Sequence, residues 1–205
     1  MHYRHDDIYH VYNRGNNKVK IFFNEENYFY FLKKVQTEWL NWCDILSYCL
    51  MPNHFHFMLK PNEAGCKTVL LRDQASHLQV LSKSIGKTLS SYTNAINIQN
   101  KTTGSLFQKK TKAKCLTDDS LCVDGLKTSD YLINCFRYIH NNPLASLLVD
   151  DLRDWPWSSW HEYFGITEKK LCNHEMAKSI LGANALQIVG AGETPLNGQV
   201  ISGIW

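Results

Sequence analysis

The stretch from residue 45 to residue 60 constrains the fold of this chain most strongly. Residues 45–50 form a short apolar run, Met-Pro-Asn follows at 51–53, and residues 54–60 resume with apolar side chains at alternate positions. Two short strand patterns separated by a turn signal predict an antiparallel β-hairpin. The sequence therefore predicts a β-hairpin over residues 45–60.

Strand and helix patterns alternate around this hairpin. Strands are predicted at 8–12, at 45–50, at 54–60 and within 101–117, and helices at 24–42, 76–97 and 129–142. Asn24 and Ser129 are the predicted N-caps, and Pro143 is expected to end the last helix. This order predicts an α+β fold: a ferredoxin-like antiparallel sheet with helices on one face, plus one extra helix.

The length of 205 residues fits one domain with an appendage. We predict a domain over residues 1–165, followed by a segment of unknown role over 166–205. That segment holds a helix pattern at 173–185 and a Gly-rich, flexible tail from 190 onward. The sequence has no apolar run of membrane-spanning length and no signal-peptide pattern, so we expect a cytoplasmic protein with no membrane partner.

Positive charge is concentrated in one part of the chain. Residues 74–117 contain seven lysines and no acidic residue, although the net charge of the whole chain is only +3. Such segregation produces a local positive field that suits a polyanion. A solvated lysine surface without a partner is an equally good interpretation of charge alone.

The predicted strand at 54–60 carries two histidines at alternate positions. Alternate residues of a strand share a face, so His54, His56 and Met58 point one way and the phenylalanines between them point the other. The phenylalanine face is expected to pack on the helices, which leaves the histidines on the open side of the sheet. Two neutral imidazoles there can bind one divalent ion. A chance pair of histidines remains the alternative.

The helix predicted at 129–142 carries a tyrosine and an amide one turn apart. Tyr138 and Asn142 are spaced i and i+4, on a flank of the helix beside its apolar stripe. A flank position half outside the core lets a phenol reach a cleft and an amide oxygen reach a metal. On its own, however, Tyr138 is better explained as a packing residue.

Five motifs give the sequence a resemblance to a known family. YHVYNRGNN, LMPNHFHFML, GSLFQKKTKAK, RYIHNNP and DWPWSSWHEY occur in an order that resembles the REP-associated tyrosine transposases, a single-tyrosine branch of the HUH enzymes. The resemblance covers residues 3–164. It implies a ferredoxin-like fold, Mg²⁺ or Mn²⁺ as cofactor, and single-stranded or hairpin DNA as partner.

The resemblance also implies roles for particular residues. His54 and His56 match the histidine pair, Tyr138 matches the catalytic tyrosine, and Asn142 matches the polar metal ligand. The segment with Lys109, Lys110 and Lys112 has lysines where an arginine is expected, which favours phosphate contacts over bidentate base contacts. The expected DNA-binding residues are Arg14, Lys101, Lys109, Lys110, Lys112, Lys114 and Arg137.

These roles predict a transposase-like DNA transesterase. Tyr138 would attack a phosphodiester, form a 5′-phosphotyrosine link and release a 3′-hydroxyl that can later reverse the step. One alternative is a nucleic-acid-binding module that has kept the fold without the chemistry. Another is a metal-dependent hydrolase of a small substrate, which typically needs three protein ligands around an open site. The sequence leaves monomer and homodimer open.

Overall fold

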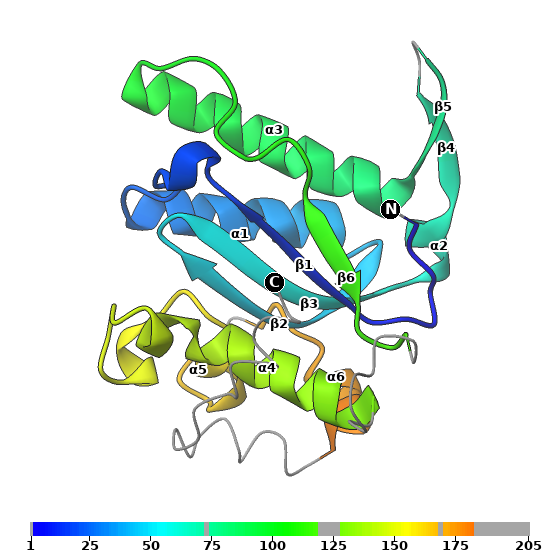
Figure 1. Cartoon of the computed structure of the whole chain (residues 1–205), viewed down its shortest axis with the longest axis vertical. Helices are drawn as coiled ribbons and strands as arrows, with labels where there is room; N and C mark the ends of the chain where they lie inside the picture. The colour runs from blue at the N-terminus through cyan, green and yellow to red at the C-terminus, as the bar shows by residue number, and fades with distance from the viewer. Residues whose placement is uncertain (1, 72–73, 119–127, 168–169, 183–205) are drawn as a thin grey trace.

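The computed structural model describes residues 2–71, 74–118, 128–167 and 170–182 (Figure 1). The strands are β1 (Tyr9–Arg14), β2 (Cys43–Met51), β3 (His54–Pro61), β4 (Thr68–Leu71), β5 (Gln74–Gln79) and β6 (Lys112–Cys115). The helices are η1 (Asn16–Lys18), α1 (Glu25–Trp39), α2 (Glu63–Cys66), α3 (Val80–Asn100), α4 (Thr128–Ala145), η3 (Leu152–Asp154), α5 (Trp160–Tyr163) and α6 (His174–Leu181).

The main sheet has the strand order β2-β3-β1-β6, and each neighbouring pair is antiparallel. Helices α1 and α3 lie side by side on one face, and α4 lies on the other (Figure 1). Strand order and connectivity are those of a ferredoxin-like sandwich, with β4 and β5 inserted as a hairpin before α3. The predicted α+β class is confirmed.

Alternation along β3 divides the core into two parts. Phe55, Phe57 and Leu59 are fully buried and pack in one apolar cluster with residues of α1 and α3. Met58 points to the opposite face and packs in a second cluster with residues of α4. Because side chains alternate between the two faces of the sheet, β3 contributes to the apolar clusters on both faces.

The histidine face of the sheet is not open, and this expectation was wrong. Helix α4 covers it, and Phe136 and Ile139 on α4 are fully buried in the same cluster as Met58 and Cys49 of the sheet. The physical reason is that the apolar stripe of α4 must be buried against another element, and β2 and β3 provide that surface.

The bounds of three helices differ from those predicted. Helix α1 ends at Trp39, three residues before the predicted end at residue 42. Helix α3 begins at Val80, because the preceding residues pair as β5 with β4, with Val69 opposite Leu78. Helix α4 begins at Thr128, before Ser129, and continues through Pro143 to Ala145. A proline in the last turn removes only one backbone donor, and the backbone N–H of Leu148 donates to the carbonyl of Pro143 to close the helix end.

The outer edge of β2 is covered by the segment that follows η3. The backbone N–H of Leu50 donates to the carbonyl of Trp157, and the N–H of Ser159 donates to the carbonyl of Tyr48. Trp157 also stacks on Tyr28 of α1, with 4.5 Å between ring centroids. This segment therefore joins the sheet edge to α1.

The chain after residue 165 also packs on the sheet where it is described. Asn173 caps α6 through its side chain, which accepts from the N–H of Met176, and its amide donates to Asp44 at 2.8 Å. The division at residue 165 stays a prediction, and the predicted flexible tail lies outside the described residues. Within the described ranges, no helix is both long and apolar enough to cross a bilayer.

Ser159 allows a test of how the sheet edge and α4 are joined. Its hydroxyl accepts from the N–H of Tyr48 at 2.9 Å and lies 2.7 Å from Nε2 of His140, and all these groups are buried. We expect Ser159→Ala to lower the free energy of unfolding by about 1–3 kcal/mol, because buried polar groups lose a partner. Urea denaturation measures this. The same change at exposed Ser90 on α3 is the control, and equal midpoints for both variants would contradict the assignment.

Candidate functional site

Strand register gathers the predicted site residues on the α4 side of the sheet. Residues directly opposite each other in paired strands share a face. Three rows of side chains therefore run across the neighbouring strands on this face. They are Arg14–His54, Lys112–Tyr12–His56 and Lys114–His10–Met58. The first two rows lie where β1 ends and β3 and β6 begin. The sheet thus places both histidines beside residues of β1 and β6.

The turn residue Asn53 fixes the orientation of His54. The Asn53 side chain donates through Nδ2 to the carbonyl of Lys18, at 3.3 Å, so its Oδ1 is the atom that faces Nδ1 of His54, at 2.6 Å. An amide oxygen only accepts hydrogen bonds, so the proton of the neutral imidazole lies on Nδ1. Nε2 of His54 is then a hydrogen-bond acceptor and a possible metal ligand.

The loop around Asn53 is tightly packed. Gly15 donates its N–H to the carbonyl of Asn53 at 2.8 Å, and a Cβ at Gly15 would lie 2.2 Å from the carbonyl oxygen of Val19. Only glycine therefore fits between these backbones. The NRGNN motif supports the turn that orients His54.

Asn142 brings a second acceptor to His54. Its Nδ2 donates to the carbonyl of Tyr138, one turn earlier on α4, at 2.8 Å. This bond turns Oδ1 toward the sheet, where it lies 3.5 Å from Nε2 of His54. With the proton of His54 on Nδ1, two acceptors face each other, an arrangement that a cation stabilises. Two imidazoles and one amide oxygen suit a first-row transition-metal ion, which accepts nitrogen ligands, better than Mg²⁺, which prefers oxygen ligands.

His56 lies beside this pair. Its ring centroid is 4.9 Å from that of His54, with the two ring planes at 84°. The His56 ring is fully buried, and its Nδ1 lies 2.8 Å from Nε2 of His10 on β1. Both sequence-predicted histidines and Asn142 therefore converge, although they come from β3 and α4.

Burial keeps both candidate imidazoles neutral. Desolvation lowers the pKa of His54 to about 4, and the nearby charge of Arg14 acts in the same direction. Desolvation also holds the pKa of His56 well below its usual value. Neutral imidazoles have the lone pairs that a metal ligand requires.

Tyr138 lies next to His56, with 5.4 Å between ring centroids. Its side chain is only 7% exposed, so the expectation of a half-exposed flank was wrong. Burial raises the pKa of this phenol above its usual value, and the polar side chain of Asn142 opposes the shift. Tyr138 is thus close to the candidate ligands but protonated at neutral pH in this structure.

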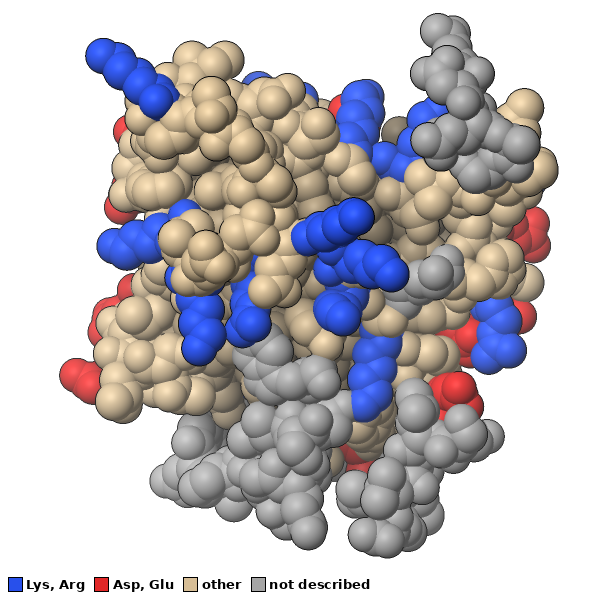
Figure 2. Space-filling view, turned by 45° about the horizontal axis from the view of Figure 1, so that its top comes forward, with Lys and Arg blue, Asp and Glu red and all other residues tan. Residues whose placement is uncertain are grey.

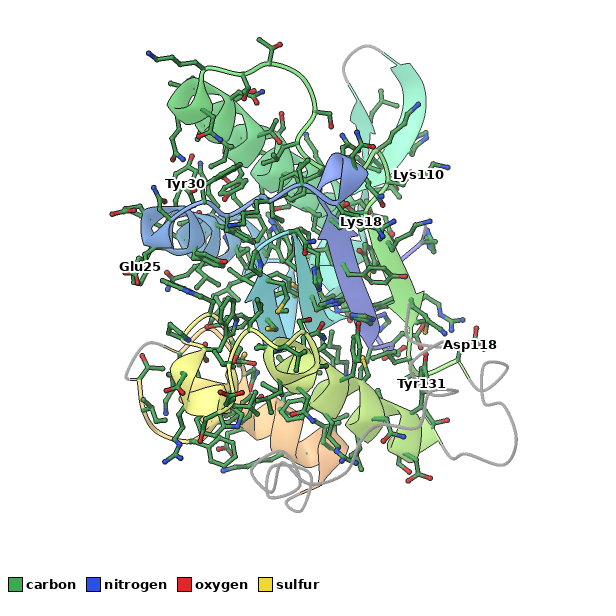
Figure 3. All side chains as sticks on the ribbon, turned by 60° about the vertical axis from the view of Figure 1, so that its left-hand side comes forward. Lys18, Glu25, Tyr30, Lys110, Asp118 and Tyr131 are labelled. Atoms are coloured by element: carbon green, nitrogen blue, oxygen red, sulfur yellow. The ribbon has the colours of Figure 1, made fainter. Side chains whose placement is uncertain are left out.

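Lysines border the cluster on the β6 side. Lys112 and Lys114 share the face of the histidines, and the ammonium of Lys114 lies 5.3 Å from the ring centroid of Tyr131. Lys109 and Lys110 are exposed just before β6. Figure 2 shows basic side chains gathered on one face, and Figure 3 shows Lys110 and Lys18 at one end of the sheet and Tyr131 at the other.

The remaining predicted DNA-binding residues are placed less uniformly. Arg14 is exposed and lies opposite His54 in the sheet. Arg137 is half-buried on α4, next in sequence to Tyr138. Lys101 ends α3, which packs on the far face of the sheet, so the structure does not bring it to the cluster.

Sequence reasoning missed three residues of the site. His10 and Tyr12 alternate along β1 and face the cluster, where their rings stack at 4.7 Å. The YHVY pattern contained this signal, because residues two apart on a strand share a face. Asn53 was treated only as a turn residue. Among the described residues, no group of three histidine, cysteine or acidic side chains could hold a metal, so Asn142 is the candidate third donor.

Comparison with known proteins relates the chain to one structure at the level of the fold. No protein-family model matches the chain, and no curated protein matches it in sequence. The structure of a REP-associated tyrosine transposase bound to a REP hairpin is similar, with a TM-score of 0.54 over 83% of this chain and 87% of that chain. Sequence identity is 15%, so the similarity shows a shared α+β fold.

The facing acceptors predict metal-dependent stabilisation. We expect Mn²⁺ to raise the thermal midpoint of the wild type, since a ligand at about 100 times its Kd adds about 2.7 kcal/mol to the stability of the folded state. His54→Ala should lose most of this gain. His5→Ala, which removes a half-exposed histidine elsewhere, should keep it. Differential scanning fluorimetry with and without Mn²⁺ tests this, and an equal gain for His54→Ala would rule out the site.

Proposed function

We propose that the protein is a metal-dependent DNA transesterase that cleaves and rejoins single-stranded or hairpin DNA, with Tyr138 as its nucleophile. One observation carries the proposal. Tyr138 lies 5.4 Å from His56 between ring centroids, and Asn142, one turn later, faces His54 at 3.5 Å. A phenol and three neutral donors thus meet at one point of a fold shared with a DNA-bound transposase.

The chemistry is a transfer between two ester oxygens. The phenol oxygen of Tyr138 forms a bond to phosphorus while the bond to the 3′ oxygen breaks, and the phenol proton ends on that oxygen. The products are a 5′-phosphotyrosine link and a 3′-hydroxyl, and attack by a 3′-hydroxyl reverses the step. A divalent cation held by His54, His56 and Asn142 supplies Lewis-acid polarisation of the phosphate. The residues of the chain orient the phenol and exclude water.

The protonation state of Tyr138 suits a nucleophile that reacts only when its substrate is bound. Desolvation raises the pKa of the phenol, while the polar side chain of Asn142 favours the ionised form. Without DNA, the phenol therefore stays neutral. Only at the moment of attack does the proton leave, which limits side reactions of the buried residue.

The lysines around β6 supply the proposed contact with DNA. Lys109, Lys110 and Lys112 are exposed, and Lys112 lies in the same row of the sheet as His56. Point charges of this kind hold backbone phosphates without reading sequence. The structural neighbour is bound to a REP hairpin, and we propose a partner of the same class here.

A nucleic-acid-binding module without catalysis is the second candidate. The low exposure of Tyr138 and its raised pKa favour this alternative, because both oppose nucleophilic attack. The lysines serve it equally well. A hydrolase of small substrates has less support, since the described residues supply only two imidazoles and one amide to a covered site.

Replacing the phenol oxygen separates the two candidates. With Mn²⁺ and a set of single-stranded and hairpin DNAs, we expect the wild type to form an adduct that resists denaturing electrophoresis. Tyr138→Phe should form none and should still bind the same DNA, because only the nucleophilic oxygen is lost. Tyr131→Phe, a change of the same kind on α4, should keep the adduct. Adduct formation by Tyr138→Phe would eliminate Tyr138 as the nucleophile, and its absence from all three proteins would favour the binding module.

The salt dependence of binding tests the lysine surface. Each phosphate contact adds about 0.7 to the slope of log affinity against log salt for a single strand. We expect Lys110→Gln and Lys112→Gln each to reduce the slope by about that amount. Lys33→Gln on α1, across the sheet, should leave it unchanged. Fluorescence anisotropy at several salt concentrations gives the slopes, and equal slopes for all variants would place the DNA elsewhere.

A further inference from the structure

We infer that His10 is a positioning residue that holds His56 in the one tautomer able to bind a metal. The inference rests on the proposed metal site and assigns a role to a residue that is not itself a proposed ligand. Nε2 of His10 lies 2.8 Å from Nδ1 of His56, and both side chains are fully buried. Buried imidazoles at this distance share one hydrogen, so the state of one ring decides the state of the other.

The geometry is that of a well-formed hydrogen bond in a common plane. The two ring planes differ by only 20° and their centroids are 5.0 Å apart, while the facing nitrogens are much closer. The rings therefore meet edge to edge, and the hydrogen lies along the direction of both lone pairs. Tyr12, whose ring stacks on His10 at 4.7 Å, holds that ring in place from the side.

Only one of the two possible arrangements is compatible with a metal. If His56 donates from Nδ1, its Nε2 has a lone pair that can bind a cation, and His10 has its own hydrogen on Nδ1. If His10 donates instead, the hydrogen of neutral His56 lies on Nε2, and no lone pair remains for a metal. The proposed site therefore requires His10 to be the acceptor. An outer partner that fixes the tautomer in this way raises the affinity of a ligand.

The two candidate ligands are supported by different chemistry. Nδ1 of His54 faces an amide oxygen of Asn53, which can only accept. Nδ1 of His56 faces another imidazole, which can either accept or donate. His54 is thus fixed by its partner, whereas His56 depends on the tautomer of His10. This difference makes His10 the more informative position to change.

Two substitutions separate hydrogen bonding from packing. His10→Gln keeps a polar side chain whose amide oxygen can accept from Nδ1 of His56. His10→Phe keeps an aromatic ring in the core and offers no acceptor. We expect the affinity of the protein for Mn²⁺ to stay near that of the wild type in His10→Gln and to fall by about 10- to 100-fold in His10→Phe. Electron paramagnetic resonance of unbound Mn²⁺ measures the affinity, and urea denaturation checks that each variant folds.

The tautomer itself provides a readout that does not depend on activity or on metal. Long-range ¹H–¹⁵N correlation spectra of the metal-free wild type should show the hydrogen of His56 on Nδ1. Loss of this form in His10→Phe and its retention in His10→Gln would support the inference. A hydrogen on Nε2 of His56 in the wild type, or full Mn²⁺ affinity in His10→Phe, would overturn it.

The experiments distinguish failure of the proposed metal site from failure of the role assigned to His10. If the wild type binds no Mn²⁺, the metal site fails, and the spectrum of His56 still decides whether His10 sets its tautomer. If His10→Phe does not fold, the wild type and His10→Gln decide the question through the same spectrum. If both Mn²⁺ binding and the tautomer follow the substitutions but no DNA adduct forms, the role of His10 stands and the transesterase does not.

Discussion

The packing of α4 on the histidine face of the sheet is the contact on which the rest of the site depends. It brings Tyr138 and Asn142 to His54 and His56, which are more than 80 residues away in sequence. The same contact buries the imidazoles and keeps them neutral. Apolar residues such as Phe136 and Met58 provide most of the driving force for this contact, so the polar cluster is positioned by its hydrophobic surroundings.

The charged residues that can attract a polyanion and the neutral residues proposed for the chemistry lie in different places. Positive charge lies at the rim, on exposed lysines before and within β6, where it can reach a polyanion through water. The interior contains neutral donors and a neutral phenol. A charged interior would carry a large desolvation cost, whereas neutral imidazoles and an amide remain stable until a cation and a phosphate arrive together. Burial opposes ionisation of the Tyr138 phenol and keeps it neutral, which is consistent with this division.

Local patterns in the sequence predicted the strands of the main sheet and the three long helices that pack on it, but not the β4–β5 hairpin or the short helices α2 and α5. The alternation through His54 and His56 and the cap at Asn24 fixed their local structure correctly. The start of α3 was wrong because β4 captures the preceding residues, and the end of α4 was wrong because Pro143 costs little in a last turn. His10 and Asn53 were missed because their roles depend on strand register and on a side-chain contact across a turn.

The antiparallel pairing of β1 also bears on how such a chain can evolve. His10, Tyr12 and Arg14 reach the same face only because each is two residues from the next, and their partners are fixed by the register with β3. Replacing one of them alters one contact. Inserting or deleting a single residue inside β1 inverts the orientation of every position beyond it and moves those groups to the opposite core. In β1, an insertion or deletion is therefore more damaging to the site than a substitution.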